Sequence, residues 1–178
     1  MNIFLKNKLK RYIAKTAVVS NKVVIEGAVW IEEGVKIEDY AVIKGPSYIG
    51  KNSIIGNQTL VRQSMIEKDC IVGFGSEVVR SYIGPGCFLH HNFIGDSILE
   101  GDINPSWGTT FANLRLDKKP IQLKLASGVI DSGRTKLGAI VGKGAFFGVN
   151  CALMPGVTIA AGAKIFPQSI VSKPVVNK

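Results

Sequence analysis

Aliphatic residues recur at every sixth position through much of this 178-residue chain. A first run comprises Ile25, Ile31, Ile37, Ile43, Ile49, Ile55 and Val61, and a second comprises Val141, Phe147, Leu153, Ile159, Ile165 and Val171. A small residue such as Ala41, Ser53 or Ala163 follows most of them four positions later. Six residues are too few for a helix but suffice for a short strand and a tight turn, so three units make one triangular coil. The period predicts an all-β parallel solenoid of about eight coils, each burying its aliphatic residues against the next.

Two segments depart from this period. Residues 1–15 alternate apolar and basic side chains at an approximately helical spacing, so we expect residues 1–22 to form a basic amphipathic segment with a short helix. Its predicted role is a cap over the first coil, and contact with an anionic membrane surface is the less favoured alternative. Residues 114–136 form the second departure, a long loop inserted into the β-helix of residues 23–172. Residues 173–178 are expected to be a short tail.

Charge is distributed unevenly along the chain. Residues 1–25 carry six bases and no acid, residues 26–131 carry ten bases and thirteen acids, and residues 132–178 carry six bases and no acid. Two basic ends around an acidic middle argue against a continuous nucleic-acid surface and favour small anionic ligands. The length suits one domain, and no apolar run approaches the ~20 residues that span a bilayer.

The cysteines and histidines do not suggest a metal site. Cys70, Cys87 and Cys151 each occupy the small position of a repeat, so they are predicted to be buried free thiols. An odd cysteine count without a signal peptide favours a cytoplasmic location. The two histidines, His90 and His91, are adjacent, and a zinc site with three histidines is therefore excluded. Adjacent side chains point to opposite sides, so only one of the pair can face a given groove.

Residues 90–117, HHNFIGDSILEGDINPSWGTTFANLRLD, carry a more specific resemblance. This stretch resembles the acetyltransferase domain of bifunctional sugar-1-phosphate nucleotidylyltransferase/glucosamine-1-phosphate acetyltransferases, especially the archaeal type. The later strings SGRTKLGAIVG and GVNCALMPGV are similar to that family too, and the similarity covers about residues 40–172. No glycine-rich nucleotidyltransferase signature is present, so we expect the acyltransferase half alone. The resemblance implies a left-handed β-helix, a homotrimer with sites between neighbouring prisms, and acetyl-CoA as co-substrate.

The resemblance also implies roles for individual residues. His90 matches the general base that takes the proton of an attacking amine, and Asn113 matches an asparagine at the acyl group. The other implied acceptor-binding residues are Arg62, Glu77, Arg80, Phe93, Asn104, Lys118 and Lys119. The backbone N–H of Trp107 matches an oxyanion donor, and Arg134, Lys136, Lys164 and Lys173 are expected to contact the phosphates of acyl-CoA. No resident metal is predicted, although magnesium bound with a phosphate substrate remains open.

The departures from the family pattern leave three hypotheses open. Val79 replaces a lysine, Phe93 replaces a tyrosine, and Ser106-Trp107 replaces a Gly-Ala pair, where an indole could block the thioester. The favoured hypothesis is N-acetylation of an amino-sugar phosphate or a nucleotide-linked amino sugar. The alternatives are a catalytically silent β-helix for oligomerisation or ligand sensing, and an O-acyltransferase with another acceptor.

Overall fold

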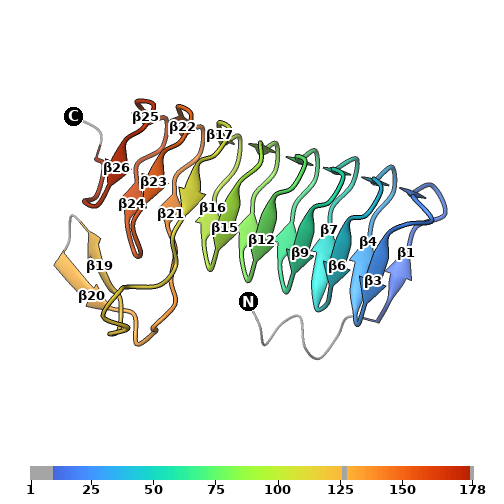
Figure 1. Ribbon diagram of the computed structural model, residues 1–178, viewed down its shortest axis with the longest axis horizontal. Helices are drawn as coiled ribbons and strands as arrows, with labels where there is room; N and C mark the ends of the chain where they lie inside the picture. Colours follow the sequence, from blue (N-terminus) through green and yellow to red (C-terminus); the bar gives the residue numbers. More distant parts are fainter. Residues whose placement is uncertain (1–9, 126–127, 177–178) are drawn as a thin grey trace.

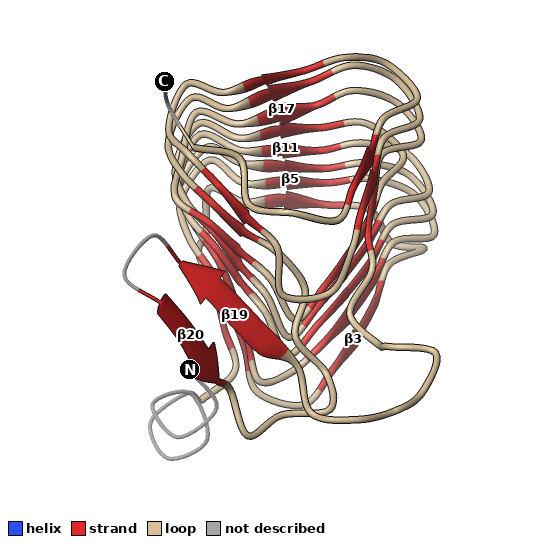
Figure 2. Cartoon of the chain, turned by 90° about the vertical axis from the view of Figure 1, so that its left-hand side faces the viewer, coloured by secondary structure: helices blue, strands red, loops and turns tan. Residues whose placement is uncertain are grey.

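The computed structural model describes residues 10–125 and 128–176. Over these residues the chain forms a parallel β-helix with three flat faces. Its coils stack along one long axis (Figure 1), and the three faces form a triangle in end view (Figure 2). The predicted all-β hexapeptide solenoid is therefore confirmed, and it is consistent with the left-handed winding that the resemblance implies. Each six-residue unit supplies one strand of two or three residues and one turn.

Successive strands of the chain visit the three faces in turn. Face 1 contains β1 (Tyr12–Ile13), β4 (Val29–Ile31), β7 (Ser47–Ile49), β10 (Met65–Ile66), β13 (Tyr82–Ile83), β16 (Ile98–Leu99), β21 (Ile140–Val141) and β24 (Thr158–Ile159). Face 2 contains β2 (Val18–Val19), β5 (Lys36–Ile37), β8 (Ile54–Ile55), β11 (Ile71–Val72), β14 (Phe88–Leu89), β17 (Asn104–Pro105), β22 (Phe146–Phe147) and β25 (Lys164–Ile165). Face 3 contains β3 (Val24–Glu26), β6 (Val42–Lys44), β9 (Leu60–Arg62), β12 (Glu77–Val79), β15 (Phe93–Gly95), β18 (Thr110–Phe111), β23 (Ala152–Leu153) and β26 (Ile170–Val171).

The repeat aliphatics form the core because most of them pair in register with a counterpart in the next coil. On face 1, Ile31 pairs in register with Ile49, which pairs with Ile66, and all three side chains are fully buried. The three cysteines are buried free thiols, as predicted. Cys70 Sγ, for example, lies 3.2 Å from the carbonyl oxygen of Gly84. Aliphatic burial along the axis thus stabilises each coil against its neighbours.

The turn at residues 90–92, between faces 2 and 3, is one residue shorter than the preceding turns. The Asn92 side chain is buried there, and its Nδ2 donates to the carbonyl oxygens of Ser106 and Thr109 at 3.1 and 2.9 Å. Its Oδ1 accepts the backbone N–H of His90 at 2.6 Å. Because this N–H turns inward, the ladder of face 2 is divided here into a five-stranded and a three-stranded sheet. Asn92 therefore joins the histidine turn rigidly to the coil of Trp107.

The N-terminal expectation is wrong for the residues that the structure describes. Tyr12 and Ile13 form β1 and pair with Trp30 and Ile31, so residues 12–13 are strand where a helix was expected. The coils consequently begin before residue 23, since β2 also pairs with β5. The spacing of apolar residues in this short segment is compatible with a helix and with a strand. A strand forms because residues 12–13 can pair with the edge of β4. Residues 1–9 of the expected cap lie outside the described residues.

The inserted loop lies outside the triangle and contains a small hairpin (Figure 2). Strands β19 (Gln122–Leu125) and β20 (Gly128–Asp131) pair antiparallel, and Leu114 bridges Lys136 where the loop leaves and returns. The loop is fixed to the β-helix by the buried side chain of Ile121, which lies where a Cβ on Gly156 would stand. Between the loop and the last coils is a hollow of about 770 Å³, lined by residues such as Leu116, Met154 and Pro174.

Candidate functional site

The two histidines point to different sides of their turn. The ring of His90 packs on Phe88 of face 2, with ring centroids 4.2 Å apart. His91 has a left-handed backbone, with φ near 40°, and its exposed ring lies at the corner between faces 2 and 3. The two histidine side chains therefore point to opposite sides of the turn, as predicted.

Strand β17, which neighbours β14 on face 2, carries a polar atom without a partner among the described residues. Phe88 and Asn104 are the outward residues of the neighbouring strands β14 and β17, and the backbone N–H of Phe88 donates to Ile103 across this gap at 2.9 Å. The Oδ1 atom of Asn104 is buried and has no hydrogen-bond partner among the described residues. A buried acceptor without a donor is costly, so this amide is suited to receive an N–H or O–H of a ligand.

A groove of about 440 Å³ lies on the other side of the turn, along the start of face 3. It is lined by Gly75, Glu77, His91, Asn92, Phe93, Trp107, Gly108, Thr110 and Asn150. The indole of Trp107 is 57% exposed and stacks on the ring of His91, so it forms a wall of this groove. Glu77, Phe93 and Trp107 are thus brought together, whereas His90 does not line the groove.

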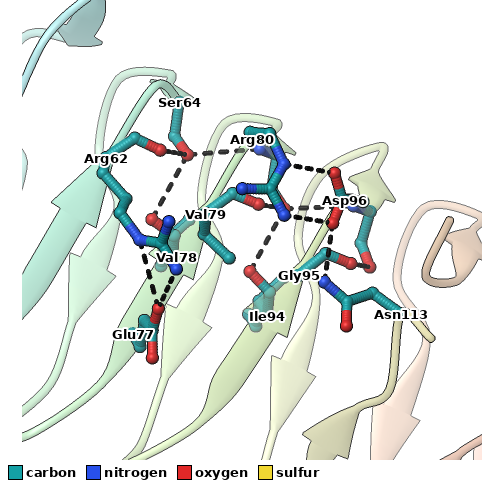
Figure 3. A network of polar contacts seen from close by, with 12 residues as sticks. Arg62, Ser64, Glu77, Val78, Val79, Arg80, Ile94, Gly95, Asp96 and Asn113 are labelled. Carbon is teal, nitrogen blue, oxygen red and sulfur yellow. Dashed lines mark hydrogen bonds and ion pairs between the residues drawn. The ribbon is translucent and has the colours of Figure 1, made fainter. Parts of the chain in front are cut away.

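The far edge of face 3 carries a network of charged side chains (Figure 3). Arg62 donates to Glu77, with Nη2 at 2.8 Å from Oε1. Arg80 makes a two-pronged ion pair with Asp96 at 2.6 and 2.7 Å, and Asn113 Nδ2 donates to the same carboxylate at 2.6 Å. The hydrogen bond to Asp96 raises the pKa of the Arg80 guanidinium. Both arginines expected to contact substrate are therefore already paired with carboxylates.

Gly95 allows two of the predicted residues to approach each other. A Cβ at Gly95 would stand 2.5 Å from Nδ2 of Asn113 and 2.9 Å from the Phe93 ring. Only a residue without a side chain lets both groups occupy this corner, which connects the groove to the ion-pair network.

The remaining predicted cations are separated into two groups. Arg134 and Lys136, on the returning limb of the loop, line a hollow of about 450 Å³ with Arg80, Asp96 and Tyr82. Three cations and one carboxylate give this hollow a positive balance that suits an anionic group. Four exposed lysines lie elsewhere: Lys118 and Lys119 in the loop, Lys164 in β25 and Lys173 after β26.

Sequence reasoning did not assign several of the site residues, among them His91, Asp96 and Asn150. His91 and Asn150 occupy left-handed turn positions, which in neighbouring coils are filled by Gly75 and Gly108. This gave no clear signal for a site, because Tyr40 and Gln58 occupy the same left-handed position in earlier coils. Asp96 belongs to the quoted Gly-Asp-Ser string, but its partners come from other coils.

Comparison with known proteins confirms the resemblance. The model described as "Bacterial transferase hexapeptide (six repeats)" matches residues 28–63. Residues 28–63 therefore carry the bacterial transferase hexapeptide repeat. It is 40% identical over 112 residues to a bifunctional sugar-1-phosphate nucleotidylyltransferase/acetyltransferase of Sulfurisphaera tokodaii, covering 62% of this chain and 28% of that protein. It is also 34% identical over 113 residues to the bifunctional protein GlmU of Methanococcus vannielii, covering 63% and 27%.

A shorter relative matches as well. The uncharacterized acetyltransferase YaiX of an Escherichia coli strain is 30% identical over 116 residues, covering 62% of this chain and 48% of that protein. The matched segments thus span about a quarter to a half of these relatives. Among solved structures, a UDP-N-acetylglucosamine acyltransferase aligns with 92% of this chain and 67% of its own, at 18% identity and a TM-score of 0.49.

In residues 10–125 and 128–176, no three His, Cys, Asp or Glu side chains gather where they could hold a metal ion. Within the same ranges, no helix is long and apolar enough to cross a membrane.

Proposed function

We propose that the protein transfers the acetyl group of acetyl-CoA to the amine of an amino-sugar phosphate or a nucleotide-linked amino sugar, with His90 as general base. The amine nitrogen attacks the thioester carbon, a C–N bond forms, and the imidazole of His90 takes the proton that the amine loses. The C–S bond then breaks, and the CoA thiolate leaves and is protonated. Imidazole is suited to this step because its ordinary pKa lies near ~6.5.

The observation that carries the proposal is the unpartnered Oδ1 of Asn104 on β17, the strand that neighbours β14, directly after which His90 follows in the chain. A buried acceptor beside a histidine can orient a donor group of the acceptor for deprotonation. The relatives named as acetyltransferases support the reaction class, and the 40% identity to the Sulfurisphaera tokodaii protein supports a sugar-phosphate acceptor.

The basic side chains differ in whether they are free to bind a phosphate of the substrates. Arg62 and Arg80 are paired with Glu77 and Asp96, so they reach a phosphate only by sharing or exchanging these partners. Arg134 and Lys136 have no ion-pair partner among the described residues, and their hollow is the better candidate for a phosphate of CoA or of the acceptor.

A homotrimer belongs to the same proposal. The outward column of face 1 contains Tyr12, Trp30, Tyr48, Met65, Tyr82, Ile98 and Ile140, an apolar stripe along several coils, and ends at Thr158. Such a stripe favours association with another copy. Light scattering under native conditions checks this, and a monomer would contradict the shared-site arrangement.

The decisive experiment measures thioester consumption with glucosamine 1-phosphate and with nucleotide-linked amino sugars as acceptors. Removal of a general base costs about 10²- to 10⁴-fold in kcat, so His90→Ala should lose most turnover while the thermal unfolding curve is retained. Gln58→Asn, an exposed turn residue at the same corner, serves as a matched control and should keep full activity. Unchanged turnover in His90→Ala refutes the base assignment. No binding of acetyl-CoA by calorimetry would favour the silent module instead.

A further inference from the structure

Cys70 and Cys87 occupy equivalent positions in successive coils, at the corner between faces 1 and 2. Each directly precedes a strand of face 2, and these two strands pair in register, with Ile71 opposite Phe88. The backbone N–H of Ile71 donates to the carbonyl oxygen of Cys87 at 2.9 Å. The two cysteines are therefore stacked at the ~4.8 Å spacing of neighbouring parallel strands.

Both thiols are buried, yet they lie close to the surface. Cys70 is fully buried and Cys87 is 1% exposed, and the two side chains are within hydrogen-bonding reach of each other. The exposed turn residues Asp69 and Gly86 directly precede them. The opening of a single turn is therefore enough to admit a small solute to the sulfur atoms.

The surroundings assign different roles to the two sulfur atoms. The hydrogen bond from the Cys70 thiol lowers the pKa of Cys87. Interaction with Cys87 and burial both raise the pKa of Cys70. Because the thiolate is the reactive form, Cys87 is the sulfur that reacts first with an oxidant, and Cys70 is placed to attack it afterwards.

Packing alone does not require sulfur at this position. In the preceding coil the position is taken by Ser53, whose Oγ accepts the backbone N–H of Cys70 at 3.0 Å. The third cysteine, Cys151, has a hydroxyl as its neighbour, since its backbone N–H donates to Oγ1 of Thr109 at 3.3 Å. Of the three cysteines, Cys70 and Cys87 are therefore the two that are stacked on each other.

Stacked coils come close to the geometry of a disulfide. A disulfide allows Cα separations of about 4.4–6.8 Å, and the spacing of the coils falls in this range. Its Cβ atoms lie about 3.8 Å apart, so the two side chains must approach by about 1 Å. Strand β14 ends at Leu89, directly before His90, so this approach acts on the histidine turn. Strained disulfides are also the ones that are readily reduced.

We propose that Cys70 and Cys87 form a reversible disulfide, which joins the coils of β11 and β14 and lowers acetyl transfer while it persists. The Cys87 thiolate attacks a peroxide, the O–O bond breaks, hydroxide leaves and a sulfenic acid forms. The Cys70 sulfur then attacks this sulfenic acid, the S–S bond forms, and water leaves with the proton of the Cys70 thiol. The two sulfurs lose two electrons, which the peroxide gains, and the hydroxide is protonated to a second water.

Peptide mapping tests the disulfide independently of any activity. In the full chain with Cys151→Ser, the two remaining cysteines fall in different tryptic peptides, residues 69–80 and 81–115. After treatment of the native protein with hydrogen peroxide, we expect a monomer that lacks two hydrogen atoms, contains no free thiol and yields these two peptides linked. Dithiothreitol should separate them. Two free thiols after peroxide treatment would overturn the proposal, as would disulfides between chains instead of within one.

Serine variants provide the matched controls. Cys70→Ser and Cys87→Ser place a hydroxyl where Ser53 has one in the preceding coil, so circular dichroism should show a retained fold. In Cys70→Ser we expect Cys87 to gain oxygen without any linked peptides. In Cys87→Ser the remaining thiol should react with peroxide about tenfold more slowly, since one pKa unit changes the thiolate fraction about tenfold. Equal rates in the two variants would overturn the assigned order of attack.

Thioester turnover tests the effect on the site, and this part of the proposal rests on the proposed function. A displacement of 1 Å can cost about 100-fold in rate, so we expect the disulfide form to lose at least about tenfold in kcat and dithiothreitol to restore it. The chain with both serines should be insensitive to peroxide. Equal turnover of the disulfide and reduced forms would overturn the effect on transfer. A reduced chain without any transfer would overturn the proposed function, whereas linked peptides would still support the disulfide.

Discussion

The ion pair between Arg80 and Asp96 should contribute far more to stability than the surface pairs. Their side chains are only 24% and 12% exposed, and the carboxylate of Asp96 receives three hydrogen bonds between 2.6 and 2.7 Å. In Asp96→Asn the guanidinium loses its counter-charge, and the new amide N–H₂ must face a donor of Arg80 or of Asn113. Asp96 has a left-handed backbone, which asparagine adopts equally well, so the substitution tests the charge rather than the turn.

The magnitude follows from burial. Exposed pairs contribute about 0.2–1 kcal/mol, whereas breaking a buried pair costs about 3–5 kcal/mol. For this partly buried pair we expect a loss of about 2–3 kcal/mol in the free energy of unfolding, and hence a fall of about 5–10 °C in Tm for a chain of this size. Urea denaturation monitored by circular dichroism, at constant protein concentration, measures the loss.

Asp102→Asn is the matched control for this experiment. Asp102 also has a left-handed backbone, but its partner Lys143 is 3.2 Å away and the two side chains are 58% and 65% exposed. We expect this variant to lose about 0.5 kcal/mol or less. Equal losses in the two variants would refute the argument from burial. A double-mutant cycle with Arg80→Gln should give a coupling of about 1–2 kcal/mol.

Three further predictions concern packing and pH. Gly95→Ala should destabilise the fold by about 1–3 kcal/mol and lower acetyl transfer, because its Cβ would displace Asn113; wild-type stability and turnover would contradict the close approach. Ile83→Ala should cost about 2–5 kcal/mol in urea denaturation, whereas Ile98→Ala, on the outward side of the same face, should cost less than half as much. Burial raises the pKa of Tyr82, so the unfolded tyrosine ionises first and stability should fall as pH rises above about 10; Tyr82→Phe should lose less stability than wild type between pH 8 and 10.5.

Much of the fold could be predicted from the sequence because a six-residue period determines which side chains face inward. Ile31, Ile49 and Ile66 follow this rule, and the structure stacks them in register. The error at Tyr12 and Ile13 arose because a few apolar residues fit a helix and a strand equally well, and only the available edge of β4 distinguishes them. The hairpin within the inserted loop was not predicted, since its pairing depends on the path of the loop around Ile121.

The candidate site was less predictable for a different physical reason. The adjacency of the two histidines indicated that only one of them can face a given groove, but the direction of each ring depends on a turn that is one residue shorter and closed by Asn92. The pairing of Arg62 with Glu77 joins residues 15 positions apart, so it depends on how the coils align. The motifs therefore indicated a part of the site residues, such as Glu77 and Phe93, whereas the register between coils determined their partners and added residues such as His91 and Asn150.

The inserted loop has a consequence for how such a protein can diversify. Leu99 of β16 pairs directly with Val141 of β21, so the stacking of coils continues without interruption although the chain leaves the β-helix between them. Because the loop enters and leaves at one corner, its length and composition can change without altering any core contact of face 1. Loop exchange between related chains is thus a practical route to altered ligand selectivity on a constant scaffold.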